Sequence, residues 1–208
     1  MSQHPGLFIT LEGGEGAGKS TAAAGLAALL RAEGHDVLAT REPGGTKGAE
    51  AIRALLLNTE TPLHPLAQTM LHFAARADHV ETVLRPALER GAIVICDRFY
   101  DSTMAYQAYG QGVAVSAVES LIQLIGLRPD VSFFLRVPED VAKARLAARA
   151  GATDRYESMG ADFTARLMHG FAEIAAQEPE RCAWVDSSAA PDAVVAELRR
   201  LIAERTGR

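Results

Sequence analysis

The feature that most constrains the fold of this chain is a glycine-rich segment that follows a short apolar run at residues 7–11. Two glycines five positions apart are followed at once by lysine and serine, which is the spacing of a phosphate-binding loop. Helical spacing begins directly afterwards, at residues 19–32. A plain glycine-rich turn is the alternative, but strand, spacing and helix together favour a site for ATP or GTP. The residues concerned are Gly13, Gly14, Glu15, Gly16, Ala17, Gly18, Lys19, Ser20 and Thr21.

Each part of this loop has a distinct expected role. Glycine permits backbone conformations that let successive N–H groups surround phosphate oxygens at a helix N-terminus. Lys19 is expected to reach the β- and γ-phosphates, and the Ser20 hydroxyl to ligate Mg²⁺. Thr21 can contact the α-phosphate or cap the helix.

Apolar runs of strand length alternate with longer helical segments along the chain. The runs lie at 7–11, 37–40, 92–96, 131–137 and 182–185. Helical spacing is found at 19–32, 48–57, 66–90, 115–125, 139–149, 163–177 and 191–205. This alternation predicts an α/β fold in three layers, in which helices flank a five-stranded parallel sheet.

The 208 residues fit one domain spanning 1–208, with no repeat or linker that would divide it. Glycines interrupt the helical patterns near 150–160, so we expect a mobile lid at about 145–160. Cys96 and Cys182 lack a partner at metal-binding spacing and are interpreted as buried core residues.

Composition argues against several classes of protein. No apolar run approaches the length of about 20 residues that a membrane-spanning helix needs. The first six residues lack the pattern of a secretion signal, so a cytoplasmic location is expected. The net charge is −5 and no long basic run occurs, which argues against a nucleic-acid-binding protein.

A second charged pair follows the apolar run at 92–96. Asp97 is placed as a carboxylate that binds Mg²⁺ beside the transferred phosphate, although an aspartate there can also cap a turn. Arg98 comes next, and its planar guanidinium matches phosphate oxygens two at a time. We therefore interpret Arg98 as a clamp for the phosphate of an acceptor, in preference to a structural ion pair.

Four signatures together resemble the thymidylate kinase family of P-loop proteins. They are the phosphate loop, the segment REPGGT at 41–46, the segment DRFYDS at 97–102, and the arginine-rich stretch at 145–155. The resemblance runs from residue 7 through the last helical segment. It implies transfer of the γ-phosphoryl group of ATP to dTMP with Mg²⁺, with both nucleotides at the carboxyl edge of the sheet. It also implies a homodimer.

The resemblance assigns an acceptor site residue by residue. Glu15 matches a carboxylate facing the sugar 3′-hydroxyl, Arg41 a group beside the acceptor phosphate, and Arg76 the arginine that bonds the thymine edge. The groups facing base and sugar are Ser102, Thr103, Tyr106 and Gln107. The family usually has phenylalanine four residues before that arginine, whereas this chain has His72 there and Phe73 one step later. Either ring could stack on thymine, but a shift of one residue turns a helical side chain by about 100°.

Positive charge that stabilises the transition state is expected from Lys19, Arg98 and the lid. Some thymidylate kinases carry an arginine within the phosphate loop, where this chain has Gly16. Arg145 and Arg149 are four apart on one predicted helix, which resembles the bacterial variant whose lid supplies the compensating arginine. We expect both to contact ATP and Arg149 to contact the transition state, with Arg155 as a further candidate.

Two other functions remain as alternatives. Another P-loop kinase, for a nucleoside or a different monophosphate, would keep the phosphate loop and change the acceptor pocket. A nucleotide-binding switch protein would bind GTP, yet the chain has no Asn-Lys-x-Asp guanine-recognition motif.

Overall fold

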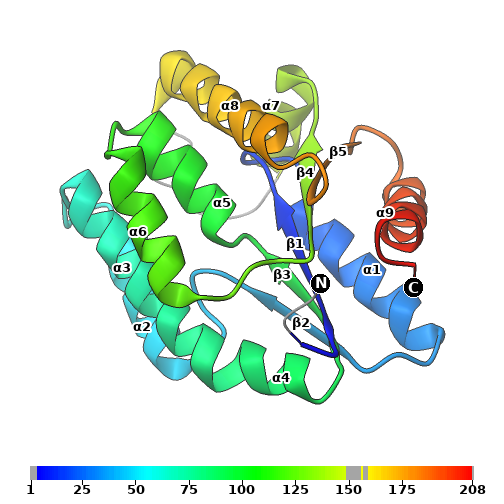
Figure 1. Cartoon of the computed structure of the whole chain (residues 1–208). Coiled ribbons are helices and arrows are strands. Elements are labelled where there is room, and N and C mark those ends of the chain that lie inside the picture. The colour runs from blue at the N-terminus through cyan, green and yellow to red at the C-terminus, as the bar shows by residue number, and fades with distance from the viewer. Residues whose placement is uncertain (1–3, 149–155, 157–158, 208) are drawn as a thin grey trace.

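The computed structural model describes residues 4–148, 156 and 159–207. Five strands of this part of the chain form one parallel sheet in the order β2-β3-β1-β4-β5 (Figure 1). The α/β fold with a five-stranded parallel sheet is thus confirmed, and β3 lies one residue later than predicted. The strands are β1 (Leu7–Glu12), β2 (Val37–Arg41), β3 (Ile93–Asp97), β4 (Val131–Arg136) and β5 (Cys182–Asp186).

Helices cover both faces of the sheet, as predicted. The α-helices are α1 (Lys19–Ala32), α2 (Lys47–Leu57), α3 (Pro65–His79), α4 (Arg85–Glu89), α5 (Tyr100–Thr103), α6 (Val115–Ile125), α7 (Glu139–Ala148), α8 (Gly160–Gln177) and α9 (Pro191–Thr206). Two π-helical segments continue α3 and α5, namely η1 (Val80–Leu84) and η2 (Met104–Gly110). Local sequence sets several boundaries: Thr46 caps α2 by accepting the N–H of Ala49, and Gly126 ends α6 with φ of 62°.

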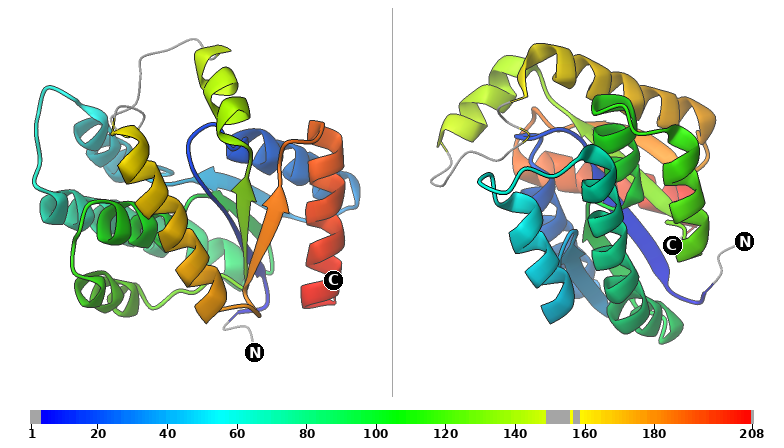
Figure 2. Two further views of the ribbon diagram at one scale, coloured as in Figure 1. Left: turned by 90° about the horizontal axis from the view of Figure 1, so that it is seen from above. Right: turned by 90° about the vertical axis from the view of Figure 1, so that its left-hand side faces the viewer.

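Alternate strand residues point to opposite faces, and this builds two cores. On one face Ile9, Ile95 and Phe133 pack against α1 and α9. On the other face Phe8, Val94 and Phe134 belong to the core that includes α6, α8 and the helices from α3 to η2. The three layers are visible in Figures 1 and 2. The sheet is therefore buried on both faces, as its unbroken apolar runs predict.

Two helical predictions need correction. The segment 66–90 was expected to be one helix, but η1 interrupts it with a π-helical turn. Residues 100–110 were not expected to be helical, yet α5 and η2 occupy them. The helical spacing is hard to recognise there because some of the buried positions are polar. Ser102, Thr103 and Gln107 are buried and line the cavity.

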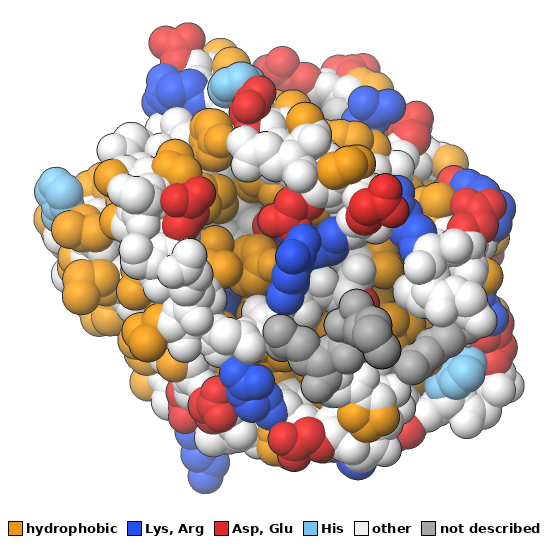
Figure 3. Space-filling view, viewed as in Figure 1, with side chains coloured by type: hydrophobic (Ala, Val, Ile, Leu, Met, Phe, Trp, Pro, Cys, Tyr) orange, Lys and Arg blue, Asp and Glu red, His pale blue; other side chains and the backbone are white. Residues whose placement is uncertain are grey.

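None of the helices in the described ranges is long and apolar enough to span a lipid bilayer. Acidic and basic side chains are interspersed on the face drawn in Figure 3, with no broad area of one sign.

Candidate active site

A cavity of about 590 Å³ opens where the carboxyl ends of β1, β2 and β3 meet. The strand register explains why, because Asp97 at the end of β3 lies opposite Leu11 of β1 and Arg41 of β2. Most of the residues predicted from sequence line this cavity: Glu15, Gly16, Gly18, Lys19, Ser20, Thr21, Arg41, His72, Arg76, Asp97, Arg98, Ser102, Thr103, Tyr106, Gln107 and Arg145. Ligands bind at this edge in open α/β sheets generally.

The phosphate loop joins β1 to α1, and the backbone of β4 and α7 packs closely against it. A Cβ atom on Gly13 would approach the carbonyl oxygen of Leu135 within 2.4 Å, and one on Gly16 the oxygen of Ala142 within 2.7 Å. Both glycines also have positive φ, at 133° and 74°. Glycine is therefore required at both positions, by space as well as by backbone conformation.

Lys19 is buried and directed along this loop. Its Nζ donates to the carbonyl oxygens of Gly13 at 3.1 Å and Gly14 at 2.7 Å. Burial lowers the pKa of Lys19 to about 8, and the nearby charge of Arg98 lowers it further. A negatively charged ligand beside Nζ would favour the charged ammonium again, as expected for a phosphate contact.

Ser20 and Asp97 form a pair suited to a hard cation. The Ser20 hydroxyl donates to Oδ2 of Asp97 at 2.5 Å, although the residues are 77 positions apart in sequence. A hydroxyl and a carboxylate are oxygen ligands of the kind that Mg²⁺ takes in sites shared with phosphates. The two predicted metal ligands are thus brought together, and their chemistry fits Mg²⁺.

Arg98 is the most constrained side chain of the cavity. Its φ of 70° is the one positive value among the described non-glycine residues. The guanidinium donates to Gly13 O at 3.0 Å, Ser102 Oγ at 3.2 Å and Tyr106 Oη at 3.1 Å, and also to a carboxylate oxygen of Glu15. Backbone strain at such a position is typical of functional sites. The structure therefore fixes a positive group next to the phosphate loop.

Glu15 and Tyr106 complete this cluster. The Tyr106 hydroxyl donates to Glu15 Oε1 at 3.1 Å, and the Arg98 guanidinium lies 4.9 Å from the centre of the Tyr106 ring. Burial raises the pKa of Tyr106 well above its usual value, so the hydroxyl stays protonated. Tyr106 therefore forms part of the cavity wall and is not placed to act as an acid or base.

Arg76 also lines the cavity and is only 2% exposed. Its Nε donates to Glu42 Oε2 at 2.7 Å and its Nη2 to Thr103 Oγ1 at 3.1 Å. Its Nη1 is buried without a hydrogen-bond partner among the described residues. A buried donor without a partner costs free energy, so this atom is suited to an acceptor on a ligand.

The structure separates the two candidate stacking rings. His72 lines the cavity, whereas Phe73 is 4% exposed, belongs to the hydrophobic core and does not line it. The Phe73 ring lies 4.6 Å from the guanidinium carbon of Arg76, so it supports that arginine from the core. Burial lowers the pKa of His72 to about 3, and Arg76 and Arg98 add to this shift, so its ring is neutral.

Other predicted residues are placed at the rim or outside the described structure. Arg41 lines the cavity and pairs with Glu50 at 2.8 Å. Arg145, on α7, donates to the carbonyl oxygen of Ser187 at 2.9 Å and lies beside Gly18. Arg149 and Arg155 lie outside the described residues; of the lid predicted at about 145–160, the structure describes 145–148, 156, 159 and 160.

Several residues that line the cavity were missed by sequence reasoning, and among them are Glu42, Arg53 and Tyr156. The Tyr156 hydroxyl accepts from Gln107 Nε2 at 2.9 Å and lies 3.4 Å from His72 Nε2. Glu42 stands in the segment REPGGT, which was recognised without assigning that carboxylate a role. Tyr156 belongs to no such motif, so the sequence alone does not mark it as a cavity residue.

Comparisons with known proteins agree on one family. The family model described as thymidylate kinase matches residues 11–198. A thymidylate kinase of Gluconobacter oxydans is 52% identical over 96% of this chain and 95% of its own length. One of Caulobacter vibrioides is 48% identical, over 97% of this chain and 98% of its own. The crystal structure of a thymidylate kinase from Ehrlichia chaffeensis superposes with a TM-score of 0.79 at 33% identity, and the match covers 95% of this chain and 98% of that one.

Proposed function

This chain belongs to the thymidylate kinase family, and from that premise we propose how its cavity transfers the γ-phosphoryl group of ATP to dTMP. The observation that carries the proposal is one cavity that holds a phosphate loop, the Ser20–Asp97 pair and a second cationic group beside them. Lys19 belongs to the loop and Arg98 is the second cation, and both donate to the carbonyl oxygen of Gly13. A donor and a phosphorylated acceptor both fit such a site.

ATP binds through the phosphate loop in this proposal. The backbone N–H groups of residues 13–18 and the α1 N-terminus face its phosphates, and Lys19 contacts the β- and γ-phosphates. Ser20 and Asp97 hold Mg²⁺. When bound, the ion neutralises charge on the phosphate oxygens and helps to align them. Thr21 and Arg145 line the cavity on the same side.

dTMP occupies the opposite part of the cavity. Arg98 and Arg41 bind its phosphate, and the Glu15 carboxylate faces the sugar 3′-hydroxyl. Arg76 offers Nη1 to an acceptor on the thymine edge, because that donor has no partner among the described residues. The neutral ring of His72 flanks the base. Thr103 and Gln107 complete the polar wall.

Phosphoryl transfer then depends on alignment and charge rather than on covalent chemistry by the protein. Lys19 and Arg98 stabilise negative charge on the transferred group from two sides, and Arg149 of the lid adds a third positive group. The acceptor phosphate oxygen is already ionised at neutral pH, so no general base is required. Binding both nucleotides in line supplies the orientation that lowers the barrier.

Substitution of Asp97 tests this assignment. The variant Asp97→Asn keeps the shape of the side chain but removes the charge that binds Mg²⁺. We expect the Mg²⁺ concentration for half-maximal turnover to rise about 10- to 100-fold, measured by ADP release. Asp186→Asn is the matched control, because Asp186 ends the parallel strand β5 and does not line the cavity. An unchanged Mg²⁺ dependence of Asp97→Asn would refute the proposed metal site.

We also infer that two copies of the chain associate through the outer surface of α2, α3 and α6. These helices lie side by side (Figure 2, right). All of the large exposed apolar side chains in the described part of the chain belong to them, although Leu57 also lines the cavity: Leu55, Leu57, Leu66, Met70, Val115 and Leu124. Apolar surface of this kind is typical of protein interfaces.

A further inference from the structure

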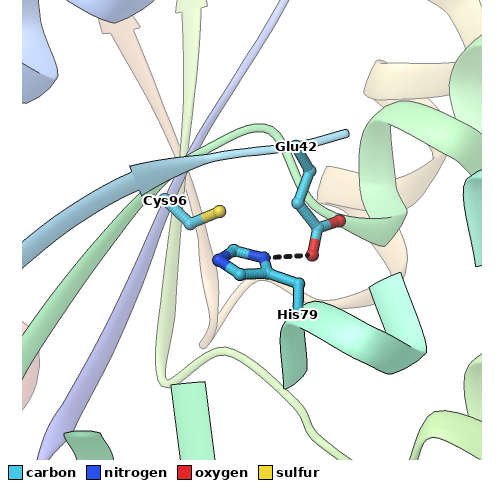
Figure 4. A group of neighbouring side chains, drawn as sticks. All are labelled: Glu42, His79 and Cys96. Atoms are coloured by element: carbon cyan, nitrogen blue, oxygen red, sulfur yellow. Dashed lines mark hydrogen bonds and ion pairs between the residues drawn. The ribbon is translucent and has the colours of Figure 1, made fainter. Parts of the chain in front are cut away.

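A buried polar cluster lies behind Arg76, between β2, β3 and the end of α3 (Figure 4). Glu42, His79 and Cys96 come close enough together to suggest a metal site. Their bonds argue otherwise, because Glu42 is already neutralised by Arg76 at 2.7 Å and both ring nitrogens of His79 have partners. The Cys96 thiol donates to the carbonyl oxygen of Arg98 at 3.0 Å, and burial raises its pKa well above the usual range. The cluster is a hydrogen-bonded chain rather than a metal centre.

The directions of the hydrogen bonds in this chain follow from the chemistry of its members. Glu42 pairs with the Arg76 guanidinium, and a carboxylate in such a pair accepts hydrogen bonds. Nδ1 of His79 therefore donates to Glu42 Oε1 at 3.1 Å. Nε2 of the same ring is hydrogen-bonded to the Thr40 hydroxyl, at 2.9 Å. The chain thus links Thr40, His79 and Glu42, with Arg76 donating to the other carboxylate oxygen.

The segment REPGGT encloses the histidine. A Cβ atom on Gly45 would lie 2.4 Å from Nε2 of His79 and 3.0 Å from Oγ1 of Thr40. His79 itself is fully buried. The imidazole therefore has little room to rotate, so it presents Nδ1 to Glu42 in one orientation.

The position of the Arg76 guanidinium depends on this chain. Glu42 holds Nε, Thr103 holds Nη2, and the rings of Phe73 and Phe99 lie 4.6 Å and 5.0 Å from the guanidinium carbon. The carboxylate of Glu42 can turn about its own side-chain bonds unless its second oxygen is also held. His79 Nδ1 supplies that second contact, and so it determines where Nη1 lies relative to the cavity.

We propose that His79 is a positioning residue for recognition of the acceptor base. It orients Glu42, which fixes Arg76 so that Nη1 is ready for an acceptor on the pyrimidine edge. This inference rests on the base-binding role proposed above for Arg76. Preorganisation of a binding group reduces the ordering cost on ligand binding, so loss of the His79 contact weakens acceptor binding more than it slows the chemical step.

A matched pair of substitutions separates the two hydrogen bonds of His79. The amide nitrogen of asparagine is one bond from Cγ, as Nδ1 is, whereas that of glutamine is two bonds away, as Nε2 is. His79→Asn therefore keeps a donor for Glu42, and His79→Gln directs its amide toward Thr40. We expect His79→Gln to raise KM for dTMP about tenfold or more. KM for ATP should change less than about twofold, and His79→Asn should restore most of the affinity for dTMP.

A double-mutant cycle distinguishes positioning from a general structural effect. Arg76→Lys removes the side chain through which His79 acts, so adding His79→Gln to it should raise KM for dTMP little further. Thermal midpoints measured alongside identify any variant that is simply unfolded. Equal effects of His79→Gln and His79→Asn, or additive effects in the cycle, would overturn the proposal. If Arg76→Lys itself leaves KM for dTMP unchanged, then the role proposed for Arg76 fails as well.

Discussion

Glu12 shows how a single buried carboxyl group can make stability depend on pH. It ends β1 and accepts the N–H of Phe99 at 2.9 Å and the hydroxyl of Ser102. Burial raises its pKa to about 8, Asp101 raises it further, and Ser102 and Arg98 partly oppose the shift. Between pH 4.5 and 8 the folded protein therefore keeps a proton that the unfolded chain has released.

The free energy of unfolding should consequently fall as pH rises through this window. The contribution of Glu12 is complete below pH 4.5 and is lost as pH passes 8, with a slope of up to about 1.4 kcal/mol per pH unit. Glu12→Gln has no proton to lose and should lack this contribution. Urea denaturation of both proteins at pH 5 and pH 8 measures the difference. Parallel pH profiles would show that Glu12 is ionised in the folded protein.

Motif residues could be placed from sequence because the chemistry of a motif is local. Asp97 ends a strand, the phosphate loop and Arg98 follow strands directly, and these groups line one cavity as expected. The functions of Glu12 and Glu42 could not be predicted in this way. Glu12 meets Ser102 from 90 positions away and Glu42 meets Arg76 from 34, so only the folded chain defines their partners.

At the scale of elements, the contact between α8 and η2 holds one wall of the cavity. Phe163 and Gly170 of α8 face Gly110 and Tyr109 of η2, and a Cβ atom on Gly170 would lie 2.8 Å from Cβ of Tyr109. The nearest atoms of Tyr109 are its Cβ and ring carbons, which cannot move aside as the end of a flexible side chain can. The close approach of the two helices therefore depends on glycine at position 170.

Gly170→Ala should push α8 away from η2. Alanine favours a helix, but the steric conflict should outweigh this gain and lower the free energy of unfolding by about 1–3 kcal/mol. Ala172→Leu adds a larger group at an exposed position of the same helix and serves as the control. Thermal denaturation compares the two variants. A Gly170→Ala protein as stable as wild type would mean that the helices accommodate the extra methyl group.

Most elements could be predicted because their apolar spacing is regular. All five strands and the helices α1, α6 and α9 agree with the predicted ranges to within one or two residues. The segment 100–110 could not be recognised as helical, because Ser102, Thr103 and Gln107 are buried for contacts in the cavity rather than in an apolar core. Polar binding groups interrupt the apolar pattern in that segment, where Tyr100, Met104, Ala105 and Ala108 belong to a hydrophobic core.

For the molecule as a whole, the exposed apolar side chains of α3 and α6 determine our expectation of a dimer. Met70 is 58% exposed and Leu124 is 80% exposed. Sedimentation equilibrium should give twice the 22.1 kDa mass of one chain. Met70→Glu should shift the equilibrium toward the monomer by adding a charge to the interface. Ala176→Glu, an exposed change on α8, should not. A wild-type monomer at all concentrations would contradict this model.

The single domain, the mobile lid and the cytoplasmic location stay predictions from sequence. The overall chemistry, by contrast, was predictable from four short segments, because together they resemble the thymidylate kinase family, to which the chain belongs. The sequence alone could not show how the binding groups of those segments are arranged in space. Arg98, which follows β3, and the phosphate loop, which follows β1, face each other because the two strands are neighbours in the sheet.

The most direct test of the central claim is ADP release by the purified protein with ATP and Mg²⁺, comparing dTMP with thymidine as acceptor. Our account predicts rapid turnover with dTMP and a value of kcat/KM for thymidine at least about 100-fold lower, because Arg98 and Arg41 then have no phosphate to bind. Comparable turnover with thymidine would contradict the account, because the arginines assigned to the acceptor phosphate would then have no role in catalysis.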